Sequence, residues 1–156
     1  MPHPVPLIRK ATPDDERATS AILHEYFEEA AVIVRDDADA VRAYLRGPGA
    51  LWLAEQNGRP IGCIALRPLD IPPAPVAEVK RLYVQRSSRG QGVADRLHDA
   101  LERGALAAGY AWLYLDTSSR MQAAIAFYLH HGYQACEPYN TNPQATLFMR
   151  KSIALP

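Results

Sequence analysis

The residues with the clearest chemical potential form one short glycine-containing segment, Arg89-Gly90-Gln91-Gly92-Val93-Ala94. It joins a strand-like apolar stretch to a stretch with helical periodicity. The first turn of a helix has unpaired N–H groups and a partial positive charge, and glycines let a bulky anion approach them closely. The segment therefore predicts a cradle for a pyrophosphate group. The alternative is a plain tight turn, because glycine-rich strand-to-helix turns are common.

Other well-known sites fit this chain less well. The segment lacks the Gly-Lys-Ser/Thr ending of a P-loop, and the three-glycine dinucleotide fingerprint with its ribose-binding acid is absent. Cys63 and Cys136 show neither a disulfide framework nor metal-ligand spacing, and Cys63 is expected to be a small core residue. His24 and His98 are isolated, so we expect both on the surface. No metal site is predicted.

The elements that must position this segment follow from periodicity and turn signals. Helix caps, apolar stripes and the Asn57-Gly58 hairpin signal predict the order β-α-α-β-β-β-α-β-α-β-β. Pro68, Pro72, Pro73 and Pro75 predict a stiff surface loop. We expect one α/β domain over residues 1–156, with its core at about 6–152. The strands are predicted at 5–10, 51–55, 60–66, 77–84, 110–116, 133–138 and 146–151, and the two later helices at 92–108 and 121–131.

Two patterns near the segment bear on how it is held. In the strand at 77–84, the apolar residue Val79 has an odd number, whereas Leu82 and Val84 have even numbers. Because side chains alternate between the two faces of a strand, a regular strand cannot bury all three on one face. The pattern therefore predicts a β-bulge around Lys80-Arg81. The alternative is a strand covered on both faces. The following helix is expected to bury a stripe at intervals of three and four residues. That stripe consists of Ala94, Leu97, Leu101, Ala105 and Ala108.

Taken together, these motifs resemble the GNAT superfamily of acyl-CoA-dependent N-acetyltransferases. Arg89, Gly92 and Ala94 match that family's Gln/Arg-x-x-Gly-x-Gly/Ala signature, and the strand at 78–84 resembles the family strand that precedes it. Further on, Ala124-Ile125-Ala126-Phe127-Tyr128 followed by Gly132-Tyr133 resembles a second family block. The resemblance implies a mixed, mostly antiparallel central sheet with two splayed parallel central strands, flanked by about four helices.

The resemblance also implies how acetyl-CoA, the cosubstrate, is held. The strand residues Leu82, Tyr83 and Val84 would face the pantetheine arm, to which Leu82 and Val84 would offer backbone groups. The pyrophosphate would be held by Arg89, Gly90, Gln91, Gly92, Val93 and Ala94. Many members have an asparagine seven residues before the helix tyrosine, but this chain has Met121 there. A polar contact would then come from Thr117, Ser118 or Ser119, or be missing.

The same resemblance implies direct transfer of the acetyl group to an amine in a ternary complex, with two candidate catalytic residues. Tyr128 is the candidate acid for the leaving thiolate, because a phenol is protonated at neutral pH. The alternative for Tyr128 is a core tyrosine. Glu78 is the candidate base, acting through a water. The alternatives for Glu78 are an ion pair with Lys80 or Arg81, simple exposure, or a water chain that makes a protein base unnecessary.

Composition narrows the class of partner. The chain has 156 residues with 17 basic and 17 acidic side chains, so its formal net charge is zero. That balance argues against nucleic acid as the main partner and weakly favours a small-molecule amine as acceptor. The start and the absence of a long apolar run predict no signal peptide, no membrane span and a cytoplasmic protein. The alternative functions are a non-catalytic acyl-CoA sensor and a protein or peptide N-acetyltransferase. A homodimer is a further expectation, because the closing strands of such folds often pair between subunits.

Overall fold

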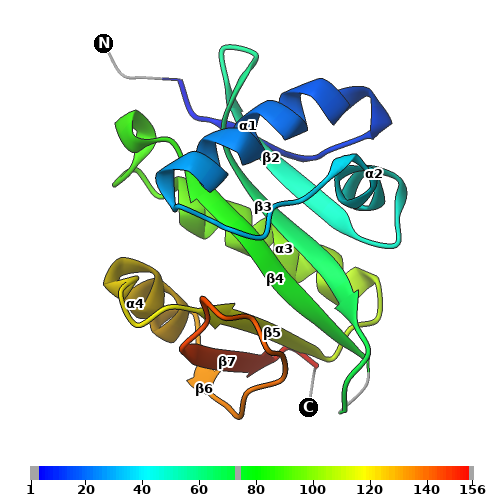
Figure 1. Cartoon of the computed structure of the whole chain (residues 1–156). Coiled ribbons are helices and arrows are strands. Elements are labelled where there is room, and N and C mark those ends of the chain that lie inside the picture. Colours follow the sequence, from blue (N-terminus) through cyan, green and yellow to red (C-terminus); the bar gives the residue numbers. More distant parts are fainter. Residues whose placement is uncertain (1–3, 73–74, 155–156) are drawn as a thin grey trace. The chain divides into compact units, whose positions relative to one another are not determined.

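A computed structural model of the chain describes residues 4–72 and 75–154, which fall into two compact units (Figure 1). Unit 1 comprises the chain up to Arg67 together with Lys80–Gly104, and unit 2 comprises Pro68–Val79 together with the chain from Ala105 onward. The strand that carries Glu78 and the helix after the glycine segment each contribute residues to both units.

Seven strands are hydrogen-bonded in the order β1-β2-β3-β4-β5-β7-β6. The sheet is mostly antiparallel, with one parallel pair, β4 and β5. Together with the four α-helices of the described ranges, it confirms the fold class predicted from the sequence. The strands are β1 (Leu7–Lys10), β2 (Ala50–Gln56), β3 (Arg59–Leu69), β4 (Val76–Val84), β5 (Trp112–Thr117), β6 (Gln134–Ala135) and β7 (Leu147–Ser152), and the helices are α1 (Glu16–Glu29), α2 (Ala38–Arg46), α3 (Val93–Ala107) and α4 (Gln122–His130).

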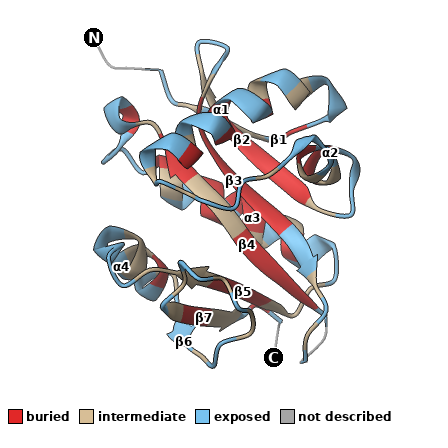
Figure 2. Ribbon diagram, in the orientation of Figure 1, coloured by how far each residue is buried: buried red, intermediate tan, exposed pale blue. Residues whose placement is uncertain are grey.

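Unit 1 is built around strands whose two faces are both covered, as the buried residues of β2, β3 and β4 show (Figure 2). Because side chains alternate along a strand, one face carries residues that pack against α1 and α2. The other face meets α3, where a side chain at Gly104 would collide with Trp52. The strand residues of the first face are Leu51, Leu53, Cys63, Ala65 and Tyr83.

Local signals explain most of the connections in unit 1. Asn57 and Gly58 have φ angles of 54° and 75°, as the hairpin between β2 and β3 requires, and this confirms the turn. The proline loop was predicted too early, because Pro68 lies inside β3, beyond the residues that pair with β2. Pro73 lies outside the described residues.

The helix after the glycine segment differs from expectation in its buried residues. Leu97, Leu101 and Ala105 are buried as predicted, but Ala94 is half-buried and Ala108 is exposed. Val93 and Ala100 are buried in their place. The helix begins at Val93, and its buried face is wider than the predicted stripe.

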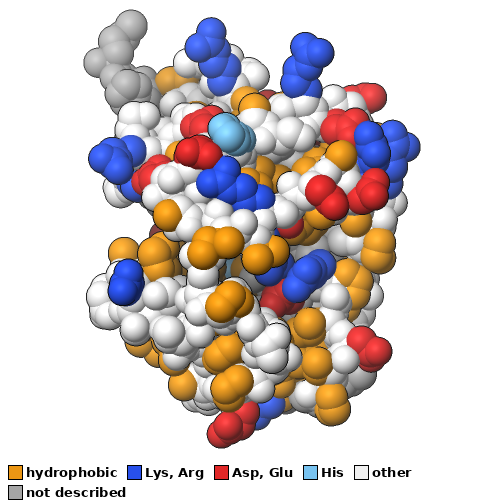
Figure 3. Space-filling view, viewed as in Figure 1, with side chains coloured by type: hydrophobic (Ala, Val, Ile, Leu, Met, Phe, Trp, Pro, Cys, Tyr) orange, Lys and Arg blue, Asp and Glu red, His pale blue; other side chains and the backbone are white. Residues whose placement is uncertain are grey.

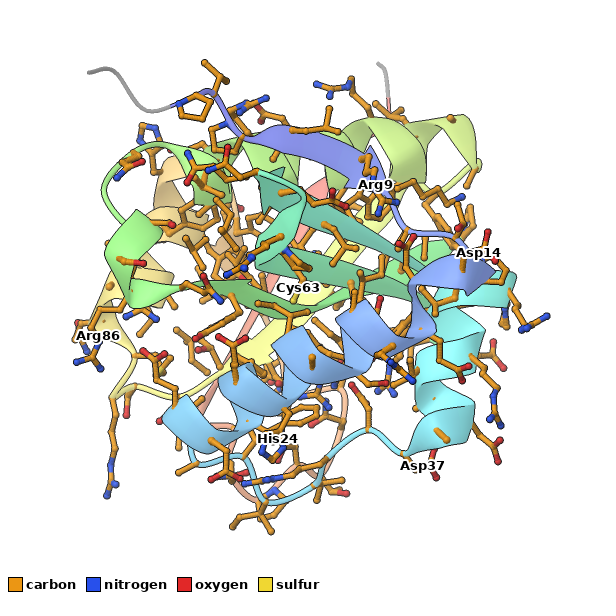
Figure 4. All side chains as sticks on the ribbon, turned by 90° about the horizontal axis from the view of Figure 1, so that it is seen from above. Arg9, Asp14, His24, Asp37, Cys63 and Arg86 are labelled. Atoms are coloured by element: carbon orange, nitrogen blue, oxygen red, sulfur yellow. The ribbon has the colours of Figure 1, made fainter. Side chains whose placement is uncertain are left out.

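One histidine of α3 was wrongly assigned to the surface. His98 is 0% exposed, next to the buried Leu97, and its Nδ1 lies 3.7 Å from Oε2 of Glu102 one turn later. Residues 97, 98 and 101 share one helical face, so a stripe one residue wider than predicted includes the imidazole. His24 is exposed on α1, as expected (Figure 4).

Unit 2 contains the parallel pair and the closing strands. Val76, Ala77 and Glu78 of β4 pair with Trp112, Leu113 and Tyr114 of β5, and β7 pairs antiparallel with β5 on its other side. Leu113, Leu115 and Met149 are buried on one face of these strands. The even-numbered residues project from the opposite face, which combines the aromatic side chains of Trp112, Tyr114 and Phe148 with polar ones such as Arg150.

Candidate functional site

The turn that leads into α3 forms an open pocket in unit 1. A short 3₁₀ helix, Arg86–Ser88, is followed by Gly90 and Gly92, whose φ angles of 77° and 78° lie in the left-handed region that favours glycine. A Cβ atom built on either glycine would meet no atom within 4 Å, so the space in front of the turn is open. The pocket measures about 210 Å³ and is lined by Val84, Ser88, Arg89, Gly90, Gly92, Val93, Ala94 and Asp95.

The pocket has the donors that a diphosphate requires. The first backbone hydrogen bond inside α3 runs from Arg96 N to Gly92 O at 3.1 Å. The earliest amides of a helix have no acceptor within the helix, and they carry its positive partial charge. Five of the six residues predicted to hold the pyrophosphate line this pocket, and the sixth, Gln91, is exposed beside it. The residues present therefore fit the diphosphate of an acyl-CoA.

The side chain of Arg89 is held on the protein itself. Its Nε donates to the carbonyl of Val84 at 2.8 Å, and its Nη2 lies 2.5 Å from Oε1 of Glu29. The hydrogen bond from Arg89 lowers the pKa of Glu29. Tyr83 donates to the other oxygen of Glu29 at 3.0 Å. Burial, and then this hydrogen bond to Glu29, raises the pKa of Tyr83 to about 12. Arg89 thus braces the turn, while Arg86 reaches into solvent (Figure 4).

The second half of β4 departs from regular strand geometry where a bulge was predicted. Arg81 has a φ of 61°, which no regular extended strand contains. Its guanidinium forms two hydrogen bonds with Asp36, at 2.9 and 3.1 Å, and its carbonyl accepts from the thiol of Cys63 at 3.3 Å. The alternative, a strand covered on both faces, also holds for the first half of β4, since Val76–Val79 are all buried.

The partner of Arg81 lies in the segment between α1 and α2, Arg35-Asp36-Asp37. Asp37 caps α2, accepting from Ala40 N at 2.9 Å. The side chain of Asp36 is only 10% exposed and forms an ion pair with Arg81. Nothing local in the sequence indicates this pairing, because the two residues are 45 positions apart.

Of the three strand residues expected along the pantetheine arm, Val84 lines the pocket. Leu82 is half-buried, while Tyr83 and Val84 are buried. Val84 lines the pocket, although its carbonyl already accepts from Arg89. A side chain at Gly62 would lie 2.7 Å from the carbonyl of Tyr83, so β3 approaches β4 closely here.

Glu78 lies in unit 2, on the first half of β4, and it is 1% exposed. The phenol of Tyr139 donates a hydrogen bond of 2.6 Å to its Oε2. The Tyr139 ring packs edge-on against Tyr114 and Phe148, with centroids 5.4 Å apart in both cases. Burial, and then the charge of Glu78, raises the pKa of Tyr139. The carboxylate is therefore buried and oriented by a phenol, so the alternative of simple exposure was wrong.

Tyr128 lies on α4 within an aromatic cluster of unit 2. It is 7% exposed, and its ring contacts Phe127 and Tyr133 edge-on at centroid distances of 5.3 Å. Tyr133 N also donates to the carbonyl of Tyr128 at 3.0 Å. This packing agrees with the core interpretation, and the role as an acid stays a prediction. Met121 stands at the N-cap of α4 and is 45% exposed.

The surface shows no concentration of one charge on the visible face. Basic and acidic side chains are interspersed there, in keeping with the balanced composition (Figure 3). Within the described ranges, none of the helices combines the length and apolar character needed to cross a bilayer.

Comparison with known proteins places this geometry in a family. The model of the Acetyltransferase (GNAT) family matches residues 15–133. N-acetyltransferase 8F1 of Rattus norvegicus is 34% identical over 110 residues, which are 69% of this chain and 50% of that protein. The chain thus spans about half the length of the curated relatives it matches first.

Solved structures show the same fold at lower sequence identity. An acetyltransferase of the GNAT family from Staphylococcus aureus has a TM-score of 0.78 and 19% identity, and the match covers 96% of this chain and 99% of that chain. N-acetylglutamate synthase from Neisseria gonorrhoeae, solved with coenzyme A and N-acetyl-glutamate, also has a TM-score of 0.78, at 16% identity. That match covers 99% of this chain and 36% of the synthase.

Proposed function

Because the chain belongs to the acetyltransferase (GNAT) family, whose members use acyl-CoA, we propose that it transfers an acetyl group from acetyl-CoA directly to a primary amine of a small molecule. The observation that carries the proposal is the open pocket at the start of α3, where two left-handed glycines leave helix amides accessible. The proposal treats both compact units as one catalytic domain, and the family match runs through both.

In this proposal the turn before α3 binds the diphosphate of the cosubstrate. The amides at the start of α3 supply hydrogen bonds and partial positive charge, and Arg89 fixes the turn through Val84 and Glu29. Val84 lines the pocket, and the backbone of Leu82, Tyr83 and Val84 would accompany the pantetheine arm. Bound there, acetyl-CoA supplies an activated thioester carbonyl.

The proton transfers fall to Glu78 and Tyr128. The amine nitrogen forms a bond to the thioester carbonyl carbon, and the carbon–sulfur bond breaks. The proton that the amine loses passes through a water to Glu78, and the departing thiolate takes a proton from the phenol of Tyr128. The burial of Glu78 and its hydrogen bond from Tyr139 support its assignment, because a general base must be held in one orientation.

The test is release of free CoA from acetyl-CoA over a panel of amines, with the acetylated product identified by mass spectrometry. We expect CoA release that depends on an amine and falls by about 10²-fold or more in Glu78→Gln, the usual effect of removing a positioned base. A protein that binds acetyl-CoA but releases CoA only at the hydrolytic rate with every amine would be an acyl-CoA sensor instead. Faster acetylation of peptides than of any small amine would assign a protein acceptor.

A further inference from the structure

Unit 2 contains a second pocket, of about 530 Å³, that none of the roles above uses. Tyr114, Tyr139 and Arg150 line it, together with Cys136, Glu137 and Pro138 from the segment before β7. It borders Tyr139, the residue that holds Glu78. Its walls therefore combine aromatic and apolar surface with polar groups that could orient a small molecule.

The cation of this pocket is held by aromatic residues. Nη1 of Arg150 donates to the phenol oxygen of Tyr114 at 3.0 Å, and the guanidinium lies 4.5 Å from the centroid of the Trp112 ring. In the described part of the chain, no carboxylate lies within ion-pair distance of Arg150, whereas Arg9, Arg81 and several other arginines have carboxylate partners. A planar guanidinium that is oriented but not neutralised is suited to receive a carboxylate in a bidentate manner.

The sheet places this cation in line with the proposed base. Glu78 pairs with Tyr114 across β4 and β5, and Tyr114 pairs with Arg150 across β5 and β7. Residues paired across neighbouring strands project from the same face, and each strand adds about 5 Å. Glu78 and Arg150 therefore project from one face of the sheet, with backbones about 10 Å apart. Tyr114 stands between them.

We propose that Arg150 binds a carboxylate of the acceptor, so that the substrate is a short aminocarboxylate whose amino end is directed toward Glu78. This inference rests on the proposed function and names its acceptor class. The amine and the carboxylate of such a molecule carry opposite charges, matching the carboxylate of Glu78 and the guanidinium of Arg150. Tyr114 and Tyr139 would cover the hydrocarbon between them.

The other ionisable groups around Arg150 leave this role open to it. Burial raises the pKa of the Cys136 thiol, so the thiol is neutral at pH 7 and does not compensate the guanidinium. Glu137 lines the pocket as well but is exposed and forms no ion pair among the described residues. Tyr114 contacts the guanidinium through its phenol oxygen. The positive charge of Arg150 is thus the main charge directed at a ligand in this pocket.

The test compares acceptors that differ only in charge. We would measure kcat/KM for β-alanine and 4-aminobutyrate and for the corresponding primary amides, with wild type, Arg150→Gln and Arg150→Lys. Wild type should prefer each carboxylate over its amide by at least about tenfold, and Arg150→Gln should lower that preference by about 10- to 100-fold. Arg150→Lys should retain part of it. Lys151→Gln is the matched control, since it removes a cation from the opposite face of β7 and should keep the wild-type preference.

Separate readouts distinguish the two proposals. If wild type acetylates amines and shows the same preference as Arg150→Gln, the inference is overturned and the proposed function stands. If wild type acetylates none of the amines, the proposed function fails, and saturation-transfer NMR of 4-aminobutyrate with the full chain and CoA decides the carboxylate site. Binding to wild type that is lost in a folded Arg150→Gln supports the site. Equal binding, or no binding, rejects it.

Discussion

The phenol of Tyr139 donates a hydrogen bond of 2.6 Å to Oε2 of Glu78, across 61 positions of sequence but within one compact unit. A second bond of the same length joins the next residue, Asn140, to Asp116 at the end of β5. The polar segment before β7 is thus tied to carboxylates on both parallel strands. It positions the proposed base and forms a wall of the pocket that contains Arg150.

Replacing Tyr139 with phenylalanine should therefore impair catalysis more than cosubstrate binding. The ring contacts with Tyr114 and Phe148 would remain, but Glu78 would lose a charge-assisted hydrogen bond. We expect kcat to fall about tenfold, with acetyl-CoA affinity unchanged, and the pH–rate profile to shift relative to wild type. Tyr110→Phe, at a half-buried tyrosine of the same unit, is the control. A variant with lower thermal stability but normal kcat and pH profile would show a structural role only.

Replacing Tyr128 with phenylalanine separates the acid from the core residue. Loss of the only proton it could give should lower turnover by about 10²- to 10⁴-fold, while acetyl-CoA affinity changes little. If Tyr128 serves only packing, turnover stays normal and the melting temperature falls, since a buried hydroxyl would lose its partner. Turnover, melting temperature and the pH–rate profile should be recorded on the same preparation, so that a different rate-limiting step is recognised. Normal turnover across the whole profile would contradict the acid role.

The turn before α3 should be sensitive to the shape of its backbone. The double variant Arg89→Ala plus Gly92→Val should weaken acetyl-CoA binding at least tenfold in isothermal titration. Of the two single variants, Gly92→Val should account for more of the loss, because it places a branched side chain at a left-handed φ in front of the amides. Arg89→Ala should act by loosening the turn, since Glu29 already matches its charge.

Circular dichroism should show that these variants remain folded, because both positions are exposed. Arg103→Ala, an exposed change further along α3, serves as the control for the loss of a cation. Unchanged affinity in the folded double variant would remove the assignment of the diphosphate pocket.

Local signals in the sequence were sufficient for the order of the elements and for the glycine turn before α3. Asn57-Gly58 and the glycines at 90 and 92 require particular φ angles, and the structure has them. Long-range pairs were beyond such reasoning. The contact between Glu78 and Tyr139 depends on how a loop crosses the sheet, and no spacing encodes it.

Burial on α3 was misjudged for a related reason. The spacing of apolar residues gives the direction of a helix's buried face only to within about one residue. His98 lies at the edge of the predicted buried stripe, so its burial could not be read from that spacing. The irregularity at Arg81 was indicated by the sequence, because the alternation of apolar residues along β4 breaks between Val79 and Leu82. Its partner Asp36, in the segment between α1 and α2, was not indicated by the sequence.

Asp15 provides a test of stability against pH. Its carboxylate accepts hydrogen bonds from Arg9 at 2.7 and 2.8 Å and from Thr12 N at 2.7 Å, and the hydrogen bonds from Arg9 are the main reason that its pKa is lowered to about 2. A carboxyl with a lower pKa in the folded state stabilises the protein above its unfolded pKa, and this stabilisation is lost as the pH falls toward the folded pKa. The contribution should thus be complete above about pH 5, much reduced at pH 2 and absent below about pH 1.

Asp15→Asn should accordingly lower the free energy of unfolding by about 1 kcal/mol at pH 7, allowing for solvent screening, and by much less at pH 2. Urea denaturation of wild type and variant at several pH values between 2 and 7 measures the difference. Asp14→Asn, the exposed neighbour in the same turn, should show a smaller difference (Figure 4). A loss that is equal for Asp15→Asn at every pH would mean that the substitution acts through packing, and that the bonds from Arg9 do not depend on the charge of Asp15.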